Sequence, residues 1–194
     1  MSATPALIGP GYARMARVSG ADYLIRPAEQ ADLDAIAAFE VEIALVSFGE
    51  DAIADPAFHR RRVAAALGRP GDTALVAVAA GSRRGAGHGR PVGWAWLTAR
   101  TNSLTGARYG NFRSLAVAAG PDRPRIGELL MNAILRAAEE QGFTMLSGKV
   151  HAANIGMRAL YRRSGFTATH ITMEKHARGG TLAADSEPGP EGRA

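Results

Sequence analysis

The order of strand-like and helical segments restricts this chain to few folds. A short strand pattern near the start is followed by two helical segments, and three more strand patterns come in succession between Thr73 and Ala118. After Ala118, helical and strand-like patterns alternate. Strands in succession followed by alternation place helices on both faces of one sheet. The order β-α-α-β-β-β-α-β-α-β therefore predicts an α/β fold with a mixed sheet and helices on both of its faces.

Hydrophobic periodicity and capping residues set the expected bounds of these elements. The second helix has clear signals, with Asp55 as cap, Pro56 in the first turn and Gly68 as its stop. The longest helix carries one apolar stripe and ends at Gly142. The expected helices are Leu33–Leu45, Pro56–Leu67, Arg125–Gln141 and the residues after Asn154; the expected strands are Tyr23–Arg26, Thr73–Ala80, Val92–Thr98, Tyr109–Ala118, Thr144–Val150 and Phe166–Glu174, with a hairpin loop at 81–90.

The composition is that of one globular domain. The chain has 194 residues, of which 46% are hydrophobic and 21% charged. Residues 1–20 and 177–194 are rich in Gly, Pro and Ser with little periodicity, so we expect a disordered leader and tail around a folded domain at 21–176. No apolar run reaches the roughly 20 residues that span a bilayer. Pro5 and Gly9 interrupt the region where a secretion signal would be apolar, so we expect a cytoplasmic protein without a membrane partner.

Several functional classes are excluded or disfavoured by residue content. The chain has no cysteine, which excludes thiolate nucleophiles and cysteine metal sites. Its five histidines lack ligand spacing, so we expect no metal. The net charge of +5 raises the alternative of a nucleic-acid binder, which would bind with a steep salt dependence. The basic residues are scattered, however, and all but Lys149 and Lys175 are arginines, as GC-rich codon usage would give. We therefore expect no nucleic-acid partner.

Two segments carry recognisable spacing. The first, SLAVAAGPDRPRIGELLMNAIL at Ser114–Leu135, joins a strand to a long helix through a tight loop, with Gly127 ten residues after Val117. The second, NIGMRALYRRSGF at Asn154–Phe166, reads as a short helix that ends at a glycine before an extended segment, with Tyr161 on its apolar face. Together they resemble the cofactor-binding half of the GCN5-related N-acetyltransferase (GNAT) family. The resemblance implies a GNAT-like, mostly antiparallel sheet and acetyl-CoA as acyl donor, without a metal.

The resemblance assigns cofactor contacts to residues of both segments. The strand is implied to offer its backbone to the pantetheine arm, and the helix start to hold the pyrophosphate, because helix N-termini bind anions. Asp122 and Arg125 depart from the family pattern, and Pro124 removes one N–H donor. We expect Asp122 to turn away and cap the helix, and the neighbouring arginines to meet the phosphates; the alternative is a plain capped helix start. The implied cofactor-binding residues are Leu115, Ala116, Val117, Arg123, Arg125, Ile126, Gly127, Glu128, Asn154 and Tyr161.

The implied reaction is attack of a neutral amine on a thioester held between two splayed strands. The resemblance gives Tyr161 the role of protonating the departing thiolate, and an N–H of the Val117 strand the role of polarising the thioester carbonyl. The family's usual glutamate base is missing, because its positions hold Asn111, Arg113 and Lys149. His151, which we expect to share a strand face with Lys149, could act as the base through water. Glu40 and Glu42 are further candidates.

The same substitutions bear on the acceptor. Arg113 and Lys149 would line the acceptor cleft with positive charge, which favours an acceptor with a carboxylate or phosphate. The leading hypothesis is an N-acyltransferase that moves an acetyl group from acetyl-CoA to the primary amine of a small molecule or peptide, as a homodimer if it follows the family habit. The alternative is a non-catalytic module that binds CoA weakly or not at all and acts in protein interactions.

Overall fold

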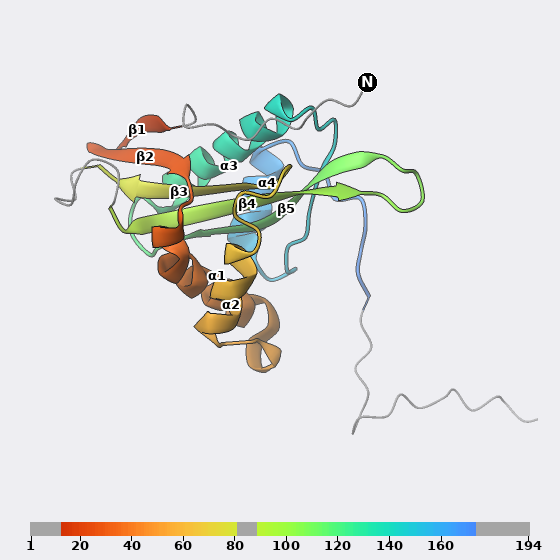
Figure 1. Cartoon of the computed structure of the whole chain (residues 1–194), viewed down its shortest axis with the longest axis horizontal. Coiled ribbons are helices and arrows are strands. Elements are labelled where there is room, and N and C mark those ends of the chain that lie inside the picture. The colour runs from red at the N-terminus through yellow and green to blue at the C-terminus, as the bar shows by residue number, and fades with distance from the viewer. Residues whose placement is uncertain (1–12, 81–88, 174–194) are drawn as a thin grey trace, which may run out of the picture.

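The computed structural model describes residues 13–80 and 89–173, which fold around one sheet (Figure 1). The sheet has six strands in the order β1-β2-β3-β4-β5-β6. Neighbouring strands are antiparallel except for β5 and β6, which run parallel. The sheet is therefore mixed and mostly antiparallel, which confirms the expected fold class. The strands are β1 (Arg14–Val18), β2 (Ala21–Pro27), β3 (Thr73–Ala79), β4 (Pro91–Thr101), β5 (Arg108–Val117) and β6 (Leu146–Gly148).

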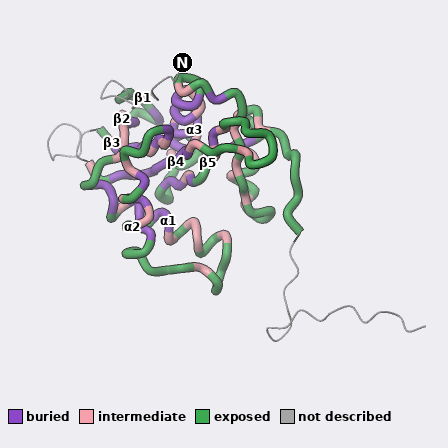
Figure 2. The backbone as a smooth tube through the Cα atoms, turned by 45° about the vertical axis from the view of Figure 1, so that its right-hand side comes forward, coloured by how far each residue is buried: buried purple, intermediate pink, exposed green. Residues whose placement is uncertain are grey.

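The helices lie on both faces of the sheet, as the element order predicts (Figure 1). Helices α1 and α2 cover one face and pack on each other, with a core around Trp94 and Trp96. Helices α3 and α4 cover the other face, with a larger core. Figure 2 shows the buried backbone concentrated in the sheet and in the sides of the helices that face it. The helices are α1 (Leu33–Phe48), α2 (Pro56–Ala64), α3 (Arg123–Glu140) and α4 (Ile155–Arg163), with short 3-10 turns η2 (Gln30–Asp32) and η3 (Gly49–Asp51).

Local signals place the helix starts well. Asp55 caps α2 as predicted, since its carboxylate accepts the N–H of Ala57 at 2.9 Å and Pro56 follows in the first turn. The helix itself ends at Ala64 rather than Leu67, and the chain continues in turns to Gly68. Helix α3 carries the predicted apolar stripe, with Leu130 and Ile134 fully buried. No helix among the described residues is both long and apolar enough to cross a membrane.

The predicted leader is wrong at its end, because Arg14–Val18 forms strand β1. This strand pairs with β2 through a tight turn in which Ser19 and Gly20 both have positive φ, the geometry of a two-residue hairpin. Only Val18 of β1 is buried, so apolar periodicity gave no signal there. Residues 1–12 and 174–194, which include the rest of the leader and the predicted tail, lie outside the described residues, as do residues 81–88 of the expected hairpin loop.

The predicted strand at Phe166–Glu174 is not a strand over its described residues, 166–173. Alternating residues there suggest a strand, but Ile171 and Met173 are 86% and 87% exposed. A strand needs a neighbour to complete its hydrogen bonds, and within the described residues this segment pairs with no edge of the sheet. The neighbouring β6 is itself only three residues long, against the seven expected at Thr144–Val150.

Candidate active site

Strands β5 and β6 separate and form a fork. They pair in parallel at only three positions, from Gly110 opposite Leu146 to Phe112 opposite Gly148. Beyond that point β5 continues to Val117 beside β4, whereas the chain leaves β6 toward α4. The second half of β5, which holds Leu115, Ala116 and Val117, therefore has a strand neighbour on one side only among the described residues. Its backbone groups on the other edge are free to bind a ligand, because unpaired backbone N–H and C=O groups need partners.

Tyr161 lies at this fork. It projects from α4, is 8% exposed, and packs its ring against Phe112 and Phe166, with ring centres 5.8 Å and 4.7 Å away. Its hydroxyl and ring edge lie against Gly148, where a Cβ would be 2.7 Å from the phenol Cζ. Burial raises the pKa of Tyr161 above its ordinary value of 10.0. The phenol is therefore protonated at neutral pH and can donate a hydrogen bond at the point where the strands part.

Asn154 and His151 form the turn that leads into α4. The Asn154 side chain caps the helix by accepting a hydrogen bond from the backbone N–H of Met157 at 3.0 Å. The backbone N–H of Asn154 donates to the carbonyl of His151. His151 is exposed, and its Nδ1 accepts the N–H of Ala153 at 3.2 Å. Since an accepting Nδ1 carries no proton, neutral His151 has its proton on Nε2. In this geometry His151 takes up a proton only after the hydrogen bond to Ala153 breaks.

The shared strand face predicted for Lys149 and His151 is wrong. Strand β6 ends at Gly148, so both residues lie in the loop before α4, and both are exposed. The strand is short because β5 diverges from it after three pairs and no longer offers hydrogen bonds. Neither side chain makes an ion pair among the described residues.

The loop before α3 holds Asp122 in an unexpected way. Asp122 is the N-cap residue, but its side chain does not cap the helix as predicted. Its carboxylate instead accepts the hydroxyl of Tyr23 on β2 at 2.9 Å. This hydrogen bond also raises the pKa of Tyr23. The partner lies 99 residues away in sequence, so local capping preferences could not reveal it. The carboxylate is thereby held toward β2 rather than on the first N–H groups of α3.

Basic side chains surround the start of α3. Arg125 donates to Glu128 at 2.9 Å, Arg163 of α4 lies 3.4 Å from the same carboxylate, and Arg123 lies 3.5 Å from Glu42 of α1. All three guanidiniums are more than half exposed, so these ion pairs are weak, about 0–1 kcal/mol each. Exposed arginines of this kind can exchange a carboxylate for a phosphate, which they bind in the same planar geometry.

Gly127 and Ile126 form the buried side of this helix start. A Cβ at Gly127 would meet Leu160 and Leu115 at 3.8 and 4.0 Å, which are ordinary contacts, so packing within the protein does not require glycine there. The start of α3 thus lies beside Leu115, on the free edge of β5, and beside α4, from which Arg163 reaches Glu128. These residues fit a cosubstrate with an extended polar arm and a pyrophosphate.

The opposite face of the sheet carries a charged cluster in which Arg113 and Glu40, both candidates from the sequence, meet Arg62, which sequence reasoning missed. Arg113 is the extra residue of a bulge in β5, because Phe112 pairs with Leu97 while Ser114 pairs with Trp96. Its guanidinium lies 5.0 Å from the centre of the Trp96 ring. Arg62 of α2 lies 5.8 Å from the same ring and pairs with the buried Glu40 of α1. The alternating WAW pattern of β4 was the available signal that two large rings face one side.

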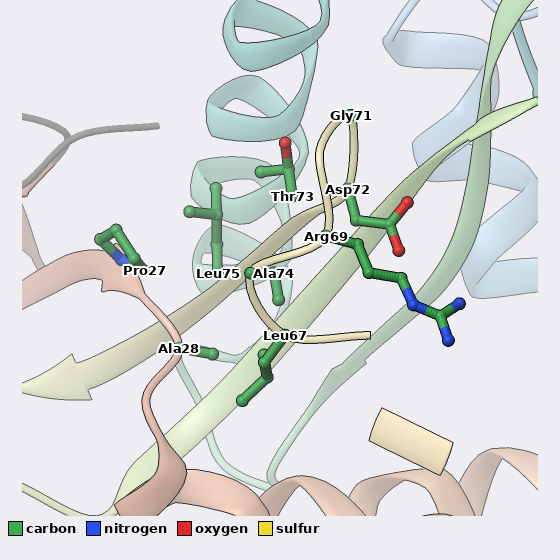
Figure 3. Close-up of a pocket in the computed structure, with 10 residues that line it drawn as sticks. Pro27, Ala28, Leu67, Arg69, Gly71, Asp72, Thr73, Ala74 and Leu75 are labelled. Atoms are coloured by element: carbon green, nitrogen blue, oxygen red, sulfur yellow. The ribbon is translucent and has the colours of Figure 1, made fainter. Parts of the chain in front are cut away.

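A pocket of about 170 Å³ opens beside this charged region (Figure 3). It is lined by the end of β2, by the loop between α2 and β3, and by the first residues of β3. Figure 3 shows the side chains of Arg69 and Asp72 extending from that loop to one side. Burial raises the pKa of Asp72, while an N–H bond from Ala99 and the nearby arginines oppose this shift. No three His, Asp or Glu side chains gather into a metal-binding group in the part of the chain that the structure describes.

Comparisons with known proteins agree with this fold. The model of the Acetyltransferase (GNAT) family matches residues 46–166, and the chain belongs to this family. No curated protein matches the chain by sequence. Among solved structures, a possible acetyltransferase from Clostridium difficile 630 has a TM-score of 0.61 at 20% identity, over 80% of this chain and 97% of that one. At such identity the likeness shows the fold alone.

Two further structural neighbours carry more specific names. The aminoglycoside N-acetyltransferase AAC(6')-Iy, solved in complex with CoA, has a TM-score of 0.63 at 14% identity, over 84% of this chain and 99% of that one. A ribosomal-protein-alanine N-acetyltransferase from Brucella melitensis biovar Abortus 2308 has a TM-score of 0.56 at 18% identity, over 80% and 99%. Their named acceptors differ widely, an aminoglycoside and a protein, so the shared fold does not indicate one acceptor.

Proposed function

We propose that this protein is an N-acetyltransferase that moves the acetyl group of acetyl-CoA to a primary amine of a small molecule or peptide. The observation that carries the proposal is the fork between β5 and β6, with the protonated phenol of Tyr161 at its base. Membership of the GNAT family supports acetyl-CoA as the donor. The residues that would bind it are the β5 edge at 115–117, Asn154, and the helix start with Arg123, Arg125 and Gly127.

The proposed chemistry assigns each group one task. The amine nitrogen bonds to the acetyl carbon, the carbon–sulfur bond breaks, and the sulfur takes up the proton of Tyr161. The proton that the amine loses passes through water and the proposed base and returns to the Tyr161 phenolate. Burial raises the pKa of Tyr161, so the phenol stays protonated and available as a donor to the thiolate, although the same shift makes it a weaker acid. An N–H of β5 at the fork would polarise the thioester carbonyl, the role of an oxyanion-hole donor.

Proton removal from the amine is the least constrained step. His151 remains the proposed base, acting through water after its hydrogen bond to Ala153 opens. Glu40 is a poor choice by comparison, because its carboxylate is 2% exposed and already paired with Arg62. An acceptor that binds as a neutral amine would need no strong base, since proximity to the thioester then supplies much of the rate.

Calorimetric titration with acetyl-CoA, followed by an acceptor screen, tests the proposal. We expect binding well below millimolar cosubstrate, and release of free CoA thiol with at least one amino acid, polyamine, aminoglycoside or peptide N-terminus. Absence of binding at millimolar acetyl-CoA would overturn the proposal. Binding without thiol release from any acceptor would favour the alternative, a non-catalytic CoA-binding module. Light scattering on the same samples checks the predicted homodimer.

A further inference from the structure

Two arginines from different elements lie close to one tryptophan ring. Arg62 of α2 and Arg113 of β5 lie 5.8 Å and 5.0 Å from the centre of Trp96. They are close enough that Arg113 lowers the pKa of Arg62, after burial as the larger cause. A ring face attracts a guanidinium, but it does not neutralise the charge. Two like charges held at one ring therefore repel each other until an anion joins them.

The surrounding charges do not balance this pair. Glu40 pairs with Arg62, whereas Arg113 makes no ion pair within the described residues. Burial and the charge of Arg100 lower the pKa of Arg113, and the carboxylate of Asp72 opposes this shift. Asp72 in turn interacts with Arg69, Arg100 and Arg113. The region thus holds the four guanidiniums of Arg62, Arg69, Arg100 and Arg113 against the two carboxylates of Glu40 and Asp72.

Buried polar atoms without partners gather at the same place. Among the described residues these include Oε1 of Glu40, Nε of Arg62, and the indole nitrogens of Trp94 and Trp96. The two indole rings lie 5.7 Å apart, and Arg62, which pairs with Glu40, lies 5.8 Å from the centre of the Trp96 ring, so the four side chains belong to one cluster. Buried polar atoms are nearly always hydrogen-bonded, and a group of orphans indicates a missing partner. Three of the four atoms are donors, so the partners that would satisfy them are acceptor oxygens.

The cluster lies at the fork, on the face opposite Tyr161. Arg113 directly follows Phe112, which pairs with Gly148 and touches the Tyr161 ring. Phe112 belongs to the core under α3 and α4, whereas the Arg113 guanidinium lies over Trp96, which belongs to the core under α1 and α2. A ligand held by Arg113 would therefore reach the fork from the α1–α2 side. The start of α3, with its own arginines, approaches the fork from the other end of β5.

We propose that Arg62 and Arg113 clamp an anionic group, a carboxylate or a phosphate, of the amine acceptor, with Trp96 as the floor of the subsite. The clamp rests on the proposed acetyltransfer and specifies its acceptor as an amine that also carries an anion. Glu40 is a positioning residue, because its buried carboxylate holds Arg62 beside the ring. Arg100 adds positive charge beside Arg113, and Asp72 offsets part of it.

The chain offers an optical test that does not need turnover. Both of its tryptophans, Trp94 and Trp96, lie in the cluster, so tryptophan fluorescence, excited where tyrosine does not absorb, reports on this subsite alone. The probes are inorganic phosphate and glutarate at constant ionic strength, which separate the two anion chemistries. We expect a saturable change in the native protein, and at least tenfold weaker binding in Arg113→Gln. Arg60→Gln is the matched control, since Arg60 is an exposed arginine of α2 paired with Asp34.

Each outcome of these measurements either supports or overturns the proposed anion clamp. No saturable change in the native protein, or equal binding by Arg113→Gln, overturns it. Loss of binding in Arg60→Gln as well would mean a general charge effect and also overturns it. Once an acceptor is found, Arg113→Gln should raise its KM at least tenfold, with the KM for acetyl-CoA unchanged and no effect on the uncharged amide of the same amine. If no acceptor reacts but fluorescence behaves as expected, the acetyltransfer fails and the anion subsite stands.

Discussion

The phenol of Tyr161 and the backbone of Gly148 are in direct contact, and glycine is the only residue that leaves room for this contact. Gly148 is the last residue of β6 and pairs with Phe112, so the contact fixes the tyrosine at the point where the two strands separate. The tyrosine ring is further held between Phe112 and Phe166. The position of the proposed proton donor thus depends on a residue that has no side chain of its own.

Gly148→Ala is expected to destabilise the protein and displace Tyr161. The new methyl group would overlap the phenol, and overpacking of this kind costs about 1–3 kcal/mol. Chemical denaturation measures the loss, and thiol release measures the accompanying fall in turnover. In the double variant Gly148→Ala/Tyr161→Ala the alanine at 148 should cost almost nothing, because the clash is gone. An equal cost with and without the tyrosine ring would show that the contact does not constrain this site.

Tyr161→Phe isolates the hydroxyl from the ring. The variant keeps the packing on Phe112 and Phe166, so we expect nearly unchanged stability and affinity for acetyl-CoA. The turnover number should fall roughly 100-fold, the scale of a lost proton donor. Single-turnover measurements with saturating acetyl-CoA test this expectation. An unchanged rate would return Tyr161 to a purely structural role in the core.

Alkaline pH should weaken the fold through its tyrosines. A hydrogen bond to Asp122 raises the pKa of Tyr23, and burial raises that of Tyr161. Both groups are therefore neutral in the folded state at a pH where the unfolded chain already ionises, about 10. Their contribution to the free energy of unfolding is complete below about pH 10. It is lost as the pH rises toward their higher pKa values in the folded state. Urea denaturation between pH 8 and 11 should show this fall, and Tyr161→Phe should show a shallower one.

Much of the fold followed from local sequence signals, and the exceptions share one physical cause. Asn154 as a cap and Gly165 as a stop predict the bounds of α4, because both act within one turn of the helix. In the structure Asn154 caps the helix and Gly165 has a positive φ. The strand expected after Phe166 failed, because a strand depends on a neighbour that local alternation cannot report. For the same reason β1 was missed, since its partner β2, rather than its own residues, holds it in the sheet.

The candidate site divides in the same way. The spacing of the two segments around Gly127 and Tyr161 predicts that both residues lie at one site, and in the structure both lie near the fork. The partners of the charged groups were not predicted, because each comes from a distant element. Asp122 meets Tyr23, and Arg62 meets Glu40 and Trp96, through contacts that only the folded chain creates.

Glu128 should oppose the binding of acetyl-CoA. Its carboxylate pairs with both Arg125 and Arg163 and so occupies two guanidiniums that would otherwise meet phosphates. Glu128→Gln removes the competing charge while keeping the size of the side chain. At about 8 Å in water one such charge contributes about 0.5 kcal/mol, so the Kd for acetyl-CoA should fall roughly two- to threefold at low salt.

Arg125→Gln is the counterpart of this change and should raise the same Kd, since it removes a phosphate partner rather than a competitor. Both effects should shrink as salt is added, because the groups are exposed and their interactions are screened. Calorimetry at two ionic strengths measures both variants. If Glu128→Gln weakened binding as much as Arg125→Gln, then Glu128 would serve to hold the arginines in place, and their ion pairs would be part of the binding site rather than competitors for it.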